Sequence, residues 1–315
     1  MARALLSLML IPIGLGLGWV LQSCAKRFPA QNLPTLLQRI ALLGLNPIAI
    51  VTSIWALSLG ASGVATLPFI GLGVMAFGLL AGLTAMKIFH MEKDSGTVFS
   101  LSSSMTNLGS IGSLVAFLIL GEQAFALVPF YKLFEEAWIY GLCFPIAAGV
   151  RAQRGVGSGF RLQKFLKDPM IFFSLAALVS GLALNVSGIS RPQFFRTLNA
   201  WIVPSGVFLV LVSIGMKIPK DRKQIPRPAL FTFLGIRLIL IPVFSLALAS
   251  LFGLPALPDQ TAFKVVILLS FMPTAFASLI PPAVYGLDFG LSFSLWLVSN
   301  LTLAGSLPLL WILLR

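Results

Sequence analysis

Long apolar runs follow one another along almost the whole chain, separated by short breaks rich in charge, proline or glycine. Hydrophobic residues make up 58% of the 315 residues and charged residues only 10%, and the mean hydropathy is +0.99. A soluble domain needs a more polar surface than this composition provides. We therefore expect a polytopic membrane protein in contact with the lipid bilayer. A water-soluble enzyme, a disulfide-stabilised secreted domain and a nucleic-acid-binding module are excluded.

The apolar runs predict about ten membrane spans, since a spanning helix needs roughly 20 apolar residues. The runs are continuous rather than alternating, which favours helices over the strands of a barrel. The expected fold class is all-α. The predicted spans are residues 4–23, 37–58, 66–89, 98–120, 124–150, 168–187, 199–218, 229–252, 261–284 and 289–313.

The basic residues, which give the chain a net charge of +13, are unevenly distributed between the loops. Most of them fall in the odd-numbered loops, above all in residues 151–167, whereas the opposite side holds only a few arginines. Basic loops face the cytoplasm in multi-pass proteins. The sequence thus predicts a protein of the cytoplasmic (inner) membrane with both termini outside.

The basic stretch 151–167 contains three alternating glycines and divides the ten predicted spans into two sets of five. We expect a first five-helix repeat at 1–150, a cytoplasmic linker at 151–167 and a second repeat at 168–315. Because five is odd, the second set enters the membrane from the opposite side. This inverted-repeat plan is typical of secondary transporters.

The fourth and ninth predicted spans are poor candidates for continuous helices. The fourth is polar and glycine-rich from Ser102 to Ser113, and the ninth contains Pro273, Pro281 and Pro282. A proline inside a helix costs about 3 kcal/mol. A shift of about 165 residues places Asn107 almost on Pro273, so both halves are expected to carry a broken, crossing helix at the same place. Such paired interruptions point to a transporter's binding site.

The predicted site suits an anion, because half-helix N-termini offer unpaired N–H groups and partial positive charge. Asn107 adds an amide donor, and nearby side chains add hydroxyls. The same small polar residues also serve packing between membrane helices, which is the alternative interpretation. No metal ligand set or cofactor motif is present. The residues expected to contact the ligand are Ser104, Thr106, Asn107, Gly109, Ser110, Gly112, Pro273, Thr274, Ser278 and Pro281.

Charged residues inside the spans are the second group of candidates. In the fifth span, Lys132 can reach Glu135 and Glu136 on one helix face, and a glutamate there could take up and release a proton. A self-neutralising pair is the alternative. Arg237, inside the eighth span, is expected to face protein and to act as a structural anchor more than as a ligand contact. The alternating glycines Gly14 to Gly18 predict close helix packing.

Four short segments carry a family resemblance. Residues 107–112 are similar to an Asn-x-Gly-x-x-Gly motif and residues 121–124 to a Gly-Glu-x-Ala motif. Residues 272–275 and 285–288 resemble a Met-Pro-x-Ala stretch and a Tyr-Gly-Leu-Asp stretch. These motifs resemble the auxin efflux carrier family, which includes the plant PIN proteins and belongs to the bile acid, arsenite and riboflavin-type transporter superfamily. The similarity covers nearly the whole chain.

The resemblance implies two five-helix repeats, crossed broken helices four and nine, an elevator-like movement and export of small organic acids. Two positions depart from the family pattern. Leu114 stands where a proline is usual, and Ala277 replaces an asparagine, which removes one of two amides at the crossover. A homodimer is left open by the sequence.

The function expected from the sequence is a secondary transporter, an efflux carrier for a small organic anion held at the crossover. Two alternatives remain: a sodium- or proton-coupled symporter of the same fold, and a non-transporting membrane sensor or scaffold. Sodium coupling is less favoured because residues 261–287 contain no Asp or Glu. An enzyme is not expected, since no catalytic Ser/His/Asp set or His-Glu-x-x-His motif occurs.

Overall fold

The computed structural model describes residues 10–24, 33–57, 63–152, 169–216 and 227–314. Within these ranges the regular elements are all helices, apart from one isolated β-bridge between Thr106 and Thr274. The all-α expectation is confirmed for this part of the chain. The predicted linker lies outside the described residues except for its first two positions.

The helices follow the apolar runs closely. In the first half they are α2 (Leu10–Cys24), α3 (Leu33–Arg39), η2 (Ile40–Leu45), α4 (Asn46–Trp55), η4 (Val64–Thr66), α5 (Leu67–Ile88), α6 (Lys93–Ser104), η5 (Leu108–Gly112), α7 (Ser113–Leu120), α8 (Glu122–Tyr131), α9 (Glu135–Trp138), η6 (Ile139–Cys143) and α10 (Phe144–Ala152). In the second half they are α12 (Pro169–Val186), α13 (Phe194–Gly215), α14 (Arg227–Gly235), η7 (Ile236–Leu240), α15 (Ile241–Leu251), η8 (Leu254–Ala256), α16 (Thr261–Ser270), η9 (Phe276–Leu279), α17 (Ile280–Tyr285) and α18 (Phe289–Leu314).

Five helical stretches among the described residues are long and apolar enough to cross a bilayer, and the two parts of α18 would together make a sixth. The other apolar helices are shorter, between 10 and 17 residues. The helices are thus compatible with a multi-pass membrane protein. The ten predicted spans are more than the five, or six with α18, found among the described residues. The five stretches are Leu33–Trp55, Val64–Ile88, Glu122–Arg151, Phe194–Gly215 and Arg227–Leu251.

The chain divides into two compact units, and each unit takes segments from both halves of the sequence. The first unit contains α2 to α4, α7, most of α8, α12 and α13; the second contains α5, α6, α9, α10 and α14 to α18. The first unit comprises Met1–Ser58, Ser113–Pro129 and Leu166–Lys220, and the second comprises Leu59–Gly112, Phe130–Phe165 and Asp221–Arg315. One boundary between the units, Phe165/Leu166, falls within 151–167, but each unit takes segments from both sides of this stretch. The two sequence repeats, which stay a prediction, therefore do not coincide with the compact units.

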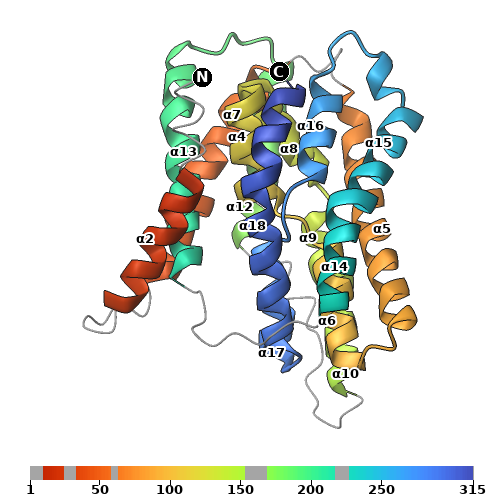
Figure 1. Cartoon of the computed structure of the whole chain (residues 1–315). Helices are drawn as coiled ribbons and strands as arrows, with labels where there is room; N and C mark the ends of the chain where they lie inside the picture. The colour runs from red at the N-terminus through yellow and green to blue at the C-terminus, as the bar shows by residue number, and fades with distance from the viewer. Residues whose placement is uncertain (1–9, 25–32, 58–62, 153–168, 217–226, 315) are drawn as a thin grey trace. The chain divides into compact units, whose positions relative to one another are not determined.

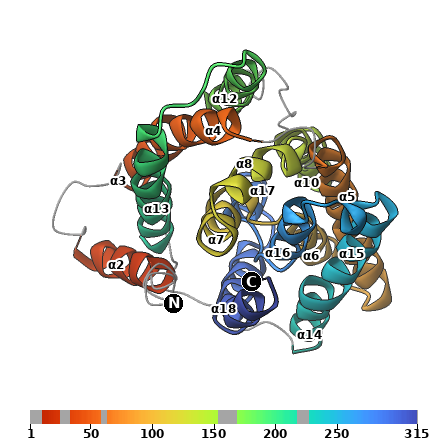
Figure 2. The ribbon, with the colours of Figure 1, turned by 90° about the horizontal axis from the view of Figure 1, so that it is seen from above.

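In the first unit, α13 packs against both α2 and α4, and α12 packs against α4 (Figures 1 and 2). Two glycines of α2 allow the close approach to α13. A Cβ added to Gly18 would lie 2.1 Å from the carbonyl oxygen of Val212, and one added to Gly14 would lie 2.8 Å from Leu211 Cβ. Gly16 has nothing within 4 Å of the same position. The predicted close packing is confirmed for Gly14 and Gly18.

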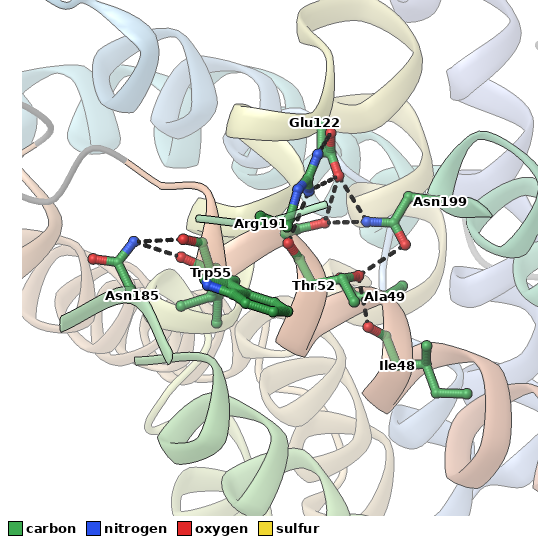
Figure 3. A network of polar contacts seen from close by, with 10 residues as sticks. Ile48, Ala49, Thr52, Trp55, Glu122, Asn185, Arg191 and Asn199 are labelled. Carbon is green, nitrogen blue, oxygen red and sulfur yellow. Dashed lines mark hydrogen bonds and ion pairs between the residues drawn. The ribbon is translucent and has the colours of Figure 1, made fainter. Parts of the chain in front are cut away.

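A network of polar side chains also links the helices of the first unit (Figure 3). Its centre is Glu122, the first residue of α8. Arg191 forms a two-point ion pair with it, with 2.6 Å from Nη1 to Oε1 and 3.1 Å from Nη2 to Oε2. Asn199 of α13 donates from Nδ2 to Glu122 Oε1 at 2.7 Å. Charge-assisted, bidentate bonds of this kind are among the stronger polar contacts in proteins.

The same network holds the end of α4 (Figure 3). Arg191 Nη1 donates to the Thr52 carbonyl at 2.8 Å, and Thr52 Oγ1 donates to Asn199 Oδ1 at 2.9 Å. Asn185 of α12 donates to three carbonyls at the end of α4, including that of Leu57 at 2.7 Å. These bonds satisfy helix-terminal carbonyls that have no partner within the helix. The network therefore joins α4, α8, α12 and α13.

In the second unit, α5 packs against α6 and α15, and α16 packs against α15 (Figures 1 and 2). The rings of Phe77 and Phe244 stack between α5 and α15, with their centroids 4.1 Å apart. Every residue of α6 from Gly96 to Ser104 is buried, including Thr97 and four serines. A helix whose serines are buried needs neighbours on every side, and α5, α10 and α18 supply them.

We expect Gly18→Ala to destabilise the protein, because the new methyl group would overlap the backbone of α13. Overpacking of this kind costs about 1–3 kcal/mol. Gly16→Ala is the matched control on the same helix. It should leave the melting temperature unchanged or raise it slightly, since alanine favours a helix over glycine by roughly 0.5–1 kcal/mol. Thermal unfolding of the detergent-solubilised variants measures both, and equal melting temperatures would contradict the packing.

Removal of one partner of the Glu122–Arg191 pair leaves the other charge largely buried. Glu122→Gln and Arg191→Gln should therefore each lower the unfolding free energy by about 3 kcal/mol, and the double variant should lose less than the sum of the two. Arg196→Gln, at an exposed position on α13, is the control and should change little. A double-mutant cycle by thermal unfolding tests this. Strict additivity would mean that the pair contributes nothing.

Candidate functional site

The predicted interruption of the fourth span is present in the structure. Helix α6 ends at Ser104, and the helix resumes as η5 at Leu108. The backbone between them is non-helical, with Met105 extended at φ −89° and ψ 116°. The helix ends where the sequence changes to a polar and glycine-rich run, so the local residues and the structure agree.

The ninth span is interrupted as well. Helix α16 ends at Ser270, and helical structure resumes as η9 and α17 after a connector that contains Pro273 (Figure 1). Pro281 and Pro282 lie in the first turn of α17. Proline is tolerated there because the backbone N–H groups of a first turn have no helical partner. The three prolines therefore have different roles, and only Pro273 lies in the connector itself.

The two connectors pair with each other inside the second unit. Thr106 and Thr274 form an antiparallel bridge. The Asn107 N–H donates to the Pro273 carbonyl at 2.8 Å, and the Ala275 N–H donates to the Met105 carbonyl at 3.1 Å. The sequence predicted that the freed backbone N–H groups would hold the ligand. The N–H groups of Asn107 and Ala275 are bonded to the opposite connector, and contact of other freed N–H groups with a ligand stays a prediction.

The Asn107 side chain keeps a donor that no group in the described part of the chain accepts. Its Oδ1 accepts hydrogen bonds from the Ile111 N–H at 3.2 Å and from Ser110 Oγ. Since a backbone N–H can only donate, these bonds fix which end of the amide is the oxygen. The opposite atom, Nδ2, is buried without a hydrogen-bond partner, and the residue is only 4% exposed. Asn107 therefore presents an unmatched N–H donor beside the paired connectors.

Most of the predicted hydroxyl groups are occupied by the protein. Ser104 Oγ accepts from Trp138 Nε1 at 3.0 Å, and Thr274 Oγ1 donates to the Ser102 carbonyl at 3.3 Å. The hydroxyl of Ser278 is different. It is fully buried and has no hydrogen-bond partner among the residues that the structure describes. Of the predicted ligand-binding side chains, Asn107 and Ser278 thus retain unmatched polar atoms.

The glycines of the predicted site have packing roles. A Cβ added to Gly112 would lie 2.8 Å from Leu269 Cδ2 and 2.9 Å from the Asn107 carbonyl oxygen. One added to Gly109 would lie 3.0 Å from Lys132 Nζ. Gly112 is therefore needed for the tight turn after Asn107. At Gly109, the end of the Lys132 side chain lies against this turn.

The fifth span departs from the continuous helix that the sequence predicted. Helix α8 ends at Tyr131, a turn follows, and α9 begins at Glu135. The predicted ion pair is confirmed at the i,i+3 spacing, with 3.1 Å between Lys132 Nζ and Glu135 Oε2. Glu136 follows in the first turn of α9. Because the turn interrupts the helix, the i,i+4 relation between Lys132 and Glu136 does not place them on one helix face.

Arg237, which the sequence suggested as a structural anchor more than as a ligand contact, bonds to residues of both interrupted helices. It lies in η7, a π-helical turn between α14 and α15, and is 2% exposed. Its Nη1 donates to Thr106 Oγ1 at 3.0 Å and to the Ser103 carbonyl at 3.4 Å, and its Nη2 donates to the Met272 carbonyl. A mid-span charge marks a candidate in any sequence. The partners of Arg237, however, lie in two other spans, and no sequence pattern near Arg237 indicates them.

No protein-family model and no curated protein matches the chain. The family resemblance of residues 107–112 and 272–275 therefore stays a prediction. The case for a functional site consists of the geometry of the second unit: two paired breaks, two unmatched polar side chains and two cations beside them.

The turn after Asn107 should depend on Gly112 more than on Gly109. A methyl group on Gly112 meets a backbone oxygen, whereas one on Gly109 meets the end of a flexible lysine side chain. Gly112→Ala should cost about 2 kcal/mol of unfolding free energy, and Gly109→Ala should cost clearly less. Thermal unfolding of the two variants in one detergent tests the difference. A larger loss at Gly109 would contradict the assignment.

Proposed function

We propose that the protein is a secondary transporter that moves a small organic anion outward across the cytoplasmic membrane. The ligand binds where the two interrupted helices meet. The observation that carries the proposal is the Asn107 amide, whose Nδ2 is buried and unmatched beside the paired connectors. A buried donor left without a partner costs about 1–3 kcal/mol, so a binding site is a physical reason to keep one.

A carboxylate suits the groups that remain unmatched. The Asn107 amide donates from Nδ2, the Ser278 hydroxyl can donate as well, and a carboxylate offers several acceptor positions. The helical turns η5 and η9 begin just after the two connectors. The ligand class therefore follows from donors rather than from a lysine or arginine placed for ion pairing.

An inverted repeat is supported by the symmetry of contacts within each unit. An antiparallel bridge has a local two-fold axis, and the bonds from Asn107 to Pro273 and from Ala275 to Met105 are equivalent under it. In the first unit, α2 packs on α13 and α12 packs on α4. In terms of the predicted spans, the first span packs on the seventh and the sixth packs on the second. Two inverted five-span repeats produce this pairing, because the sixth and seventh spans are then equivalent to the first and second. The proposal includes a ten-span topology with both termini outside.

An elevator-type movement is the form of alternating access that we propose. All of the predicted ligand-binding residues, and the Lys132–Glu135 pair, belong to the second unit. A unit that contains the whole site can carry the ligand as one body. The outward direction is favoured for an anion by an inside-negative potential, at about 2.3 kcal/mol per charge per 100 mV.

A non-transporting membrane sensor is the second candidate function. It is favoured by one observation, the mutual bonding of the two connectors, which satisfies backbone groups that a carrier would offer to its ligand. Proton coupling through Glu135 is a variant of the transport proposal. It requires a state in which the 3.1 Å contact with Lys132 is broken.

Asn107→Asp tests the transport proposal most directly. The variant keeps the oxygen that accepts from Ile111 and Ser110 but replaces the unmatched N–H donor with a negative charge. We expect at least a tenfold loss of organic-acid flux in reconstituted liposomes, since a lost bond of about 1.4 kcal/mol changes an affinity tenfold. A panel of labelled mono- and dicarboxylates, preselected by thermal shift of the wild type, provides the substrates.

Ser100→Ala is the matched control, because Ser100 lies on α6, before the break, and its hydroxyl donates to the Gly96 carbonyl of that helix at 2.8 Å. It should transport like the wild type. Ligand-induced stabilisation without flux in the wild type would favour the sensor. Unchanged flux in Asn107→Asp would refute the site.

A further inference from the structure

Arg237 lies between the two interrupted helices and bonds to both. On the side of the fourth span it reaches Thr106 Oγ1 at 3.0 Å and the Ser103 carbonyl at 3.4 Å. On the side of the ninth span it reaches the Met272 carbonyl. All four residues belong to the second unit, and the arginine is 2% exposed.

No carboxylate in the described part of the chain lies within ion-pair distance of Arg237. The Lys132–Glu135 and Arg191–Glu122 ion pairs do not involve it. Nη1 and Nη2 of Arg237 bond instead to neutral oxygen atoms, two carbonyls and one hydroxyl, while its buried Nε has no hydrogen-bond partner among the described residues. Burial of a full charge is costly unless nearby groups compensate for it. The position must therefore be favourable for a cation without any acidic residue.

The compensation comes from helix C-termini. Ser103 is among the last residues of α6, and Met272 follows the end of α16. The final carbonyls of a helix lack partners and carry partial negative charge. Two such ends and the Thr106 hydroxyl form an oxygen-lined position. In transporters with broken helices, half-helix C-termini and unwound carbonyls are the groups that coordinate a coupling cation.

We propose that the Arg237 guanidinium occupies the position of a coupling cation, so that the protein binds and moves its ligand without Na⁺ or K⁺. This inference rests on the proposed transport function, because a coupling cation has a role only in a transporter. The arginine supplies permanently the positive charge that a symporter would have to bind from solution in each cycle. Removal of the side chain should leave the carbonyls and the hydroxyl facing one another, with a free position for an alkali cation.

Three proteins distinguish this assignment from plain anchoring. Wild type, Arg237→Lys and Arg237→Ser are purified without ligand and melted in NaCl, KCl or choline chloride at equal ionic strength. Wild type should melt at the same temperature in all three salts, and so should Arg237→Lys, which keeps a cation. Arg237→Ser should melt about 5 °C higher in NaCl or KCl than in choline chloride, because an ion that binds only the folded state stabilises it.

Arg196→Ser is the matched control for the loss of one arginine, since Arg196 lies exposed on α13. It should show no difference between the salts. An alkali-cation response in the wild type would overturn the proposal, and so would a folded Arg237→Ser that melts identically in the three salts. If Arg237→Ser is unfolded in every salt, the melting temperatures of wild type and Arg237→Lys in the three salts decide the test. A salt-specific response in either refutes the proposal, and identical melting in both supports it.

The readout separates this inference from the proposed function. Melting in different salts needs neither a ligand nor flux. A protein that carries no organic anion would fail the Asn107→Asp experiment and could still show the salt response of Arg237→Ser. A sodium-dependent carrier would show flux and refute only the role of Arg237.

Discussion

Every backbone N–H and carbonyl at bilayer depth needs a hydrogen-bond partner within the protein. The second unit meets this requirement where two helices stop being helical. The connectors around Thr106 and Thr274 bond to each other as a minimal antiparallel ladder, and the Ser299 hydroxyl accepts from the Thr274 N–H at 3.1 Å. Neither break would be tolerated alone, because each supplies the partners of the other. The rest of the second unit is arranged around this pair.

The carbonyls at the ends of α6 and α16 also lack partners within their helices. Pairing satisfies the backbone of the connectors, but the helix ends beside them still concentrate partial negative charge. Arg237 lies against these ends and carries the compensating charge on a side chain. Nδ2 of Asn107 and Oγ of Ser278 have no hydrogen-bond partner among the described residues. The groups that bond Arg237 and the groups left unmatched are thus different atoms of the same region.

The first unit is stabilised in a different way. Its helices approach closely where glycines of α2 face α13, and a network around Glu122 joins α4, α8, α12 and α13 (Figure 3). Hydrophobic burial does not distinguish one apolar helix face from another in lipid, so close packing and polar bonds supply the specificity. The buried Asn199, with 0% exposure, bonds to partners on two other helices.

Several parts of this account could be predicted from residues near one another in the chain. Polar and glycine-rich residues before Ser113 end one helix, and Pro273 ends another, because local backbone preferences decide where a helix stops. The Lys132–Glu135 pair follows from a spacing of three residues. The turn at residues 132–134 was not predicted, since an apolar stretch with one proline shows no strong break signal. Apolar length alone also suggested ten spans, whereas five helical stretches in the described residues meet the length and composition of a span.

The sequence by itself determined that the chain is all-α, that it is apolar enough for a membrane and that two segments fail to remain helical. Tertiary structure alone decided which groups the breaks leave unmatched. The freed N–H of Asn107 is bonded to Pro273, its side-chain amide is not bonded, and Arg237 reaches both connectors from a third helix. The physical reason is that helix breaking depends on the residues in one segment. A hydrogen bond depends on which atoms of distant segments meet, and no local pattern records that.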